Sequence, residues 1–156
     1  MVDALLAYFH YTAMVLIAVF LVIEYQTCRP GLTPQRIRYL ARVDLFYMLA
    51  AILALATGVV RLIWFGKGAA FYLHNPVLYI KLALFVAVGL MSIPPTLQYL
   101  RWTQAMTSGG GAPEPWQVAR VSRYLQVELI LFALIPLMAV MMARGIGTQP
   151  APHGSP

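Results

Sequence analysis

Charged residues are scarce in this sequence, and long stretches of it contain none. Only 10% of the 156 residues are charged, whereas 61% are apolar, and a soluble domain of this size rarely has so few charges. The only cysteine, Cys28, cannot form an internal disulfide, and we expect an ordinary reduced thiol. Paired-cysteine metal motifs, a glycine-rich nucleotide fingerprint and a nucleophile with a triad are all missing, so zinc-dependent and hydrolytic functions have no support.

The uncharged stretches predict membrane crossings. With their flanking residues, each approaches the roughly 20 residues that span a hydrocarbon core about 30 Å thick. The four stretches are Ala4–Ile23, Leu45–Val60, Leu82–Leu100 and Leu129–Ala143. We therefore predict an all-α, integral membrane four-helix bundle forming one domain over residues 1–144, with helices at about 3–26, 34–65, 76–103 and 116–144. A cleaved signal peptide would need a cation at its start, and none is present at the start of this chain. We therefore expect the first helix to be retained.

Glycine and proline predict the segments outside these helices. Residues 104–115 include TSGGGAPEP and predict a flexible cytoplasmic linker, since neither residue type supports an element there. Residues 145–156 are expected to form a disordered tail.

The distribution of cations predicts the orientation. The first and third loops, with their helix ends, hold Arg29, Arg36, Arg38, Arg42, Arg101, Arg120 and Arg123. The positive-inside rule puts these loops in the cytoplasm and both termini on the outer, periplasmic side of a bacterial inner membrane. Topology then explains the net charge of +6, and the lipid bilayer rather than nucleic acid is the expected partner.

Three ionisable side chains are expected at one level of the outer half, with a fourth close to them. Counting along the helices puts His10, Arg61 and Lys81 at similar depths, with His74 near the entrance. An ionisable group at the bilayer centre costs roughly 2.5 to 3.5 kcal/mol, which makes each a functional candidate. Two cations and a histidine, with only Asp3 as a nearby acid, indicate an anionic ligand. The alternative is that Arg61 and Lys81 extend to the membrane surface without a ligand.

His10 leaves several functions open. A neutral imidazole in a bundle can ligate haem iron or copper, or can form a hydrogen bond between helices. Met14 lies one turn away, and a histidine–methionine pair would suit copper. Asp3, His10 and Glu24 share a sevenfold spacing, which predicts one stripe that faces protein.

Acidic residues are expected at the cytoplasmic ends of the helices. Glu24, Asp44 and Glu128 lie near Arg29, Arg42, Arg120 and Arg123 in the expected topology. Ion pairs that fasten the helix ends are the favoured explanation, and a proton pathway is the alternative. On the second helix, the small residues Ala50, Ala54, Thr57 and Gly58 form a stripe that predicts close packing.

Several short segments resemble known families. TGVVR (57–61), FGKG (65–68) and HNPVLYIKL (74–82) are similar to a family of bacterial predicted membrane proteins of unknown function. The layout more distantly resembles the HemJ-type protoporphyrinogen oxidases and the CopD-type copper-resistance membrane proteins. In the HemJ-type family, a first-helix histidine and a third-helix lysine are essential and haem b is bound, which implies these roles for His10 and Lys81.

The leading hypothesis is therefore a haem b-binding redox membrane protein. In it, His10, Lys81 and Arg61 are the candidate catalytic residues, the same three with His74 bind the cofactor, and His10 ligates the metal. Lys81 and Arg61 would face the carboxylates of a porphyrin or another anionic small molecule. The alternatives are a copper-handling or transport protein and a structural accessory subunit. In each case the protein could form a homodimer or join a larger membrane complex.

Overall fold

Residues 1–64 and 76–144 are described by the computed structural model, in which they form four α-helices. The helices are α1 (Val2–Thr27), α2 (Pro34–Trp64), α4 (Pro76–Thr107) and α5 (Pro115–Ala143). The shortest, α1, has 26 residues, or about 39 Å at 1.5 Å per residue, which exceeds the hydrocarbon core. All four are long and apolar enough to cross a membrane. The prediction of an all-α four-helix membrane bundle is confirmed.

The connections show why the helices begin and end where they do. Gly31 adopts a positive φ of 84°, and the Arg36 amide then donates to the Thr33 hydroxyl at 3.4 Å, so Thr33 caps the start of α2. At the other connection, α4 continues to Thr107, so the prediction that a flexible linker starts at 104 was wrong by one turn. Residues 104–107 contain no glycine or proline and extend the helix, which ends before Gly109, where φ is 75°.

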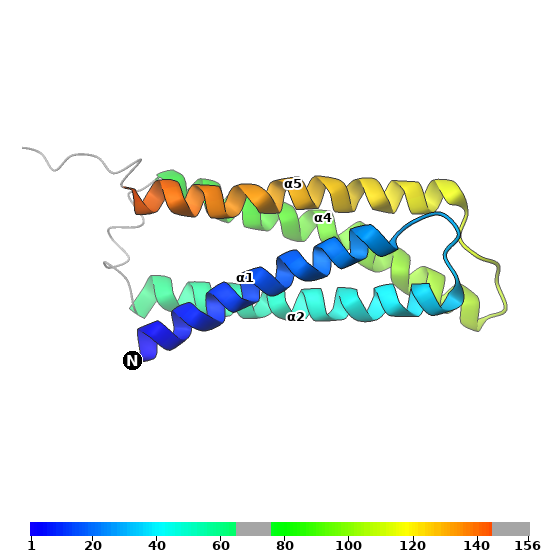
Figure 1. The fold of residues 1–156 in the computed structure, drawn as a ribbon, viewed down its shortest axis with the longest axis horizontal. Helices are drawn as coiled ribbons and strands as arrows, with labels where there is room; N and C mark the ends of the chain where they lie inside the picture. Colours follow the sequence, from blue (N-terminus) through cyan, green and yellow to red (C-terminus); the bar gives the residue numbers. More distant parts are fainter. Residues whose placement is uncertain (65–75, 145–156) are drawn as a thin grey trace, which may run out of the picture.

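The bundle consists of two helix pairs. In Figure 1, α1 crosses α2, and α4 begins behind α5 and runs obliquely away from it; α1 packs mainly on α2 and α4 mainly on α5. Contacts of α2 with α4 and of α1 with α5 close the bundle, so that α1 and α4 lie on one diagonal. Buried residues from all four helices form the core, among them Ile17, Leu40, Tyr99 and Leu125.

The start of α1 and the end of α5 lie at the same end of the bundle (Figure 1). That this end faces the outside of a bacterial inner membrane stays a prediction. The candidate residue His74 and the predicted tail 145–156 lie outside the described residues.

Candidate functional site

His10 is held against α2 by its Nδ1 atom. This atom lies 3.0 Å from the Ala54 carbonyl oxygen and 3.1 Å from the Thr57 hydroxyl. A carbonyl only accepts hydrogen bonds, so Nδ1 carries the hydrogen. In a neutral imidazole, Nε2 then keeps its lone pair. Metal-binding histidines commonly donate their other ring nitrogen to a carbonyl in this way.

The small-residue stripe on α2 provides the room for this ring. Ala54 and Thr57 are buried, and a Cβ added to Gly58 would lie 3.2 Å from His10 Cε1. The stripe therefore packs against α1, as expected, and fixes the histidine. On α1, Ile17 and Glu24 are also buried, so the predicted stripe faces protein there, whereas Asp3 is exposed.

Arg61 and Lys81 lie close enough to His10 for their charges to act on its ring, and Arg61 also acts on Lys81. Arg61 Nε lies 3.6 Å from Asp3 Oδ1, and its guanidinium carbon lies 5.7 Å from the centre of the Tyr11 ring. We call His10, Arg61 and Lys81 the basic cluster. The structure brings together these three of the four predicted site residues, the fourth being His74.

The charges of the basic cluster do not balance. Asp3 contacts Arg61, and among residues 1–64 and 76–144 it provides the only carboxylate in an ion pair. Lys81 is half-buried and has no hydrogen bond or ion pair within that part of the chain. One positive charge in a membrane-spanning helix therefore has no partner among the described residues.

A second group of ionisable residues lies deeper in the bundle. Glu24 on α1, Asp44 on α2 and Glu128 on α5 are 2%, 6% and 1% exposed. We call these three residues the carboxyl cluster. Tyr47 donates to Glu128 Oε1, and Tyr99 donates to Glu24 Oε2 at 3.3 Å.

The predicted ion pairs of these carboxyls were wrong. Within the described residues, the only ion pair joins Arg61 to Asp3, and Arg29 instead lies 4.9 Å over the Tyr25 ring. The ion pairs do not form because the side chains point in opposite directions. The arginines near the helix ends extend toward the surface, whereas the acids point into the core. Sequence analysis missed the hydroxyl partners, although Tyr47 lies three residues after Asp44 and so shares its helix face.

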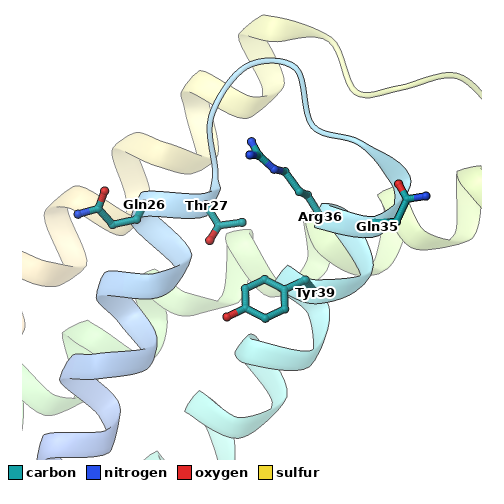
Figure 2. A pocket seen from close by; sticks show the side chains of 5 residues that line it. All are labelled: Gln26, Thr27, Gln35, Arg36 and Tyr39. Atoms are coloured by element: carbon teal, nitrogen blue, oxygen red, sulfur yellow. The ribbon is translucent and has the colours of Figure 1, made fainter.

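Two surface cavities lie at the far end of the bundle from the basic cluster. One, of about 450 Å³, is lined by Gln26, Thr27, Gln35, Arg36 and Tyr39 where α1 and α2 connect (Figure 2). The other, of about 750 Å³, lies between the end of α4 and the start of α5. Neither cavity is lined by histidine or by a residue of the carboxyl cluster.

Cys28, just after α1, is fully buried and its Sγ lies 3.9 Å from the Val118 carbonyl oxygen. Burial raises the pKa of this thiol to about 12. This agrees with the expected unreactive thiol, since the thiolate is the nucleophile. Within the described residues, no group of three or more His, Cys, Asp or Glu side chains could hold a metal ion.

A model of a family described as a predicted membrane protein matches residues 2–147. The chain belongs to the predicted membrane protein family DUF2214. The DUF2214 match covers the four helices and both clusters, and its description names a membrane location without an activity. Neither a curated protein nor a solved structure matches the chain. The protein is thus a multi-pass membrane protein whose function must be inferred from its residues.

Proposed function

We propose that the basic cluster binds a small anionic molecule within the membrane. Lys81 carries this proposal: it is half-buried in α4, beside Arg61 and His10, and no described carboxylate pairs with it. A charge in a membrane span costs roughly 2.5 to 3.5 kcal/mol. An anion bound by Lys81 and Arg61 would offset that cost through charge-assisted hydrogen bonds.

Haem b is the ligand that we propose to test first. A porphyrin would offer carboxylates to Lys81 and Arg61, and the Nε2 atom of His10 would be available to iron, because the Nδ1 hydrogen is directed at the Ala54 carbonyl. The close contact between Gly58 and the His10 ring excludes a porphyrin from the α2 side of the histidine. A bound haem would supply one-electron chemistry, while these residues would hold and orient it.

Copper is less well supported. Met14 is half-buried and packs against the core, and His10 with Met14 provides only two donors. The described residues contain no larger group of acidic, histidine or cysteine ligands. The haem proposal would need only one iron ligand, His10, from the basic cluster.

The test is titration of the detergent-purified protein with haem and, separately, with an iron-free dicarboxylic porphyrin. We expect Lys81→Met to weaken binding of both about 10- to 100-fold, since a hydrogen bond to a charged group contributes about 1.5 to 3 kcal/mol. His10→Ala should abolish the iron-dependent Soret shift and leave the iron-free porphyrin bound.

Arg144→Met is the matched control, because Arg144 is an exposed cation that directly follows α5, and α5 ends at the same end of the bundle at which α1 starts (Figure 1). Wild-type protein that binds neither porphyrin would refute the haem proposal. If Arg144→Met weakens binding as much as Lys81→Met, the basic cluster is not the site. Unchanged spectra in His10→Ala and Lys81→Met, with a co-purifying protein, would favour the structural accessory subunit.

A further inference from the structure

The carboxyl cluster brings three acids into the interior of the bundle without a counter-ion. Glu24, Asp44 and Glu128 come from three different helices, and Glu24 interacts electrostatically with the other two. Ion pairing is absent from all three in the described part of the chain. Three ionised carboxylates at this burial would carry a large desolvation cost that no cation in the described bundle offsets.

The Thr96 hydroxyl donates a hydrogen bond to the third acid, Asp44. Its hydroxyl oxygen lies 2.8 Å from Asp44 Oδ1 and 3.0 Å from the Ser92 carbonyl oxygen. A hydroxyl has one hydrogen, and the Ser92 carbonyl can only accept. The shorter contact is to Asp44 Oδ1, which accepts the hydrogen, so this oxygen needs no proton of its own.

Two carboxyl oxygens of the other acids have no hydrogen-bond partner in the described part of the chain. Glu24 Oε1 and Glu128 Oε2 are buried without a hydrogen bond. The two residues are only 2% and 1% exposed, so water does not replace the missing partners. An ionised oxygen left unpaired in an apolar interior costs more than a protonated one. Each acid therefore has one oxygen that can carry a proton: Glu24 Oε1, Glu128 Oε2, and Asp44 Oδ2, which does not accept from Thr96.

We propose that the carboxyl cluster is a proton-binding site, which holds protons at neutral pH and releases them at high pH. The titratable groups that face the three acids are Tyr47 from α2, Tyr99 from α4 and Cys28 from the connection after α1. The ligand is the proton itself, because the described acids are not arranged to hold a metal ion. This site is separate from the basic cluster and does not depend on an anionic ligand.

Infrared spectroscopy of the full chain in lipid, recorded across a pH series in H₂O and D₂O, tests the proposal. We expect a band of protonated buried carboxyls at neutral pH, shifted in D₂O and lost at high pH while the protein stays helical. Glu24→Gln, Asp44→Asn and Glu128→Gln should each remove one component of the band. Glu114→Gln, at an exposed acid before α5, should remove none.

Tyr99→Phe keeps all three acids and removes only the hydroxyl that contacts Glu24. We expect this variant to shift the Glu24 component of the band. It therefore tests the site even if a glutamine variant does not fold. The absence of the band from wild-type protein at neutral pH would overturn the proposal. So would a band that persists in the triple variant, or one that stays constant over the whole pH range in which the protein is helical. Lys81→Met should leave the band unchanged, which separates this result from that of the haem titration.

Discussion

Removing the Tyr47 hydroxyl is the sharpest test of how the carboxyl cluster stabilises the bundle. Tyr47 is 5% exposed and donates to Glu128 Oε1, while Glu128 Oε2 has no partner. Tyr47→Phe therefore leaves both oxygens of a buried carboxyl without a hydrogen bond. Hydrogen bonds between membrane helices contribute about 0.6 kcal/mol on average and up to about 1.7 kcal/mol.

Because Glu128 loses its hydrogen-bond partner completely, we expect Tyr47→Phe to lower the free energy of unfolding by about 1.5 kcal/mol, near the upper value. This corresponds to roughly a tenfold change in the unfolding equilibrium. Glu128→Met should cost a similar amount, because it leaves the Tyr47 hydroxyl unpaired. Replacing both partners by apolar groups is often nearly neutral. The double variant should therefore recover most of the loss, with a coupling energy of about 1 kcal/mol.

The assay is equilibrium unfolding in mixed micelles, followed by circular dichroism, for the wild type, both single variants and the double variant. Tyr39→Phe makes the same chemical change at a residue that is 48% exposed, and we expect it to alter stability by less than about 0.5 kcal/mol. A double variant in which the two losses simply add would refute the reasoning, as would a Tyr47→Phe variant indistinguishable from Tyr39→Phe.

Two further predictions concern the connection between α1 and α2. The Cys28 thiol should react slowly with a maleimide at neutral pH in the folded protein and quickly after unfolding. Because folding raises its pKa from 9.0 to about 12, the folded state should lose stability as pH rises through that window, and a flat profile there would contradict this. Gly31→Ala should lower the free energy of unfolding by about 1 kcal/mol, because Gly31 has a φ of 84°, although no atom within 4 Å would clash with the added Cβ. Gly111→Ala is the control, since Gly111 also lies in open space but has no positive φ. Equal stability of the two variants would argue against backbone strain at Gly31.

The sequence was sufficient to predict the four helices, because the uncharged stretches and the glycine and proline signals between them are local. It also predicted that His10, Arg61 and Lys81 converge, since counting residues from the helix ends gives depth in a bundle. Depth alone does not give rotation about the helix axis. Arg42 and Asp44 are only two residues apart, yet Arg42 is exposed and Asp44 is buried, so proximity in sequence indicated the wrong partner.

The partners of the acids were harder to predict because they come from other helices. Tyr99 reaches Glu24 across 75 positions of sequence, and Tyr47 reaches Glu128 across 81. No periodicity within one helix specifies such a pairing. The helix-face spacing of Asp44 with Tyr47, and of Thr96 with Tyr99, nevertheless placed hydroxyls beside the acid layer and could have suggested the arrangement.

The division into two helix pairs has a consequence for biogenesis. Glu24 and Asp44 belong to the α1–α2 pair, which leaves the ribosome first, whereas their hydroxyl partners Tyr99 and Thr96 belong to α4. The first pair therefore enters the bilayer with two acids that still lack these partners. Docking of the later-synthesised pair completes their hydrogen bonds. A nascent chain that stops after α2 would therefore expose two unpaired acids to membrane quality control, whereas the complete bundle buries them.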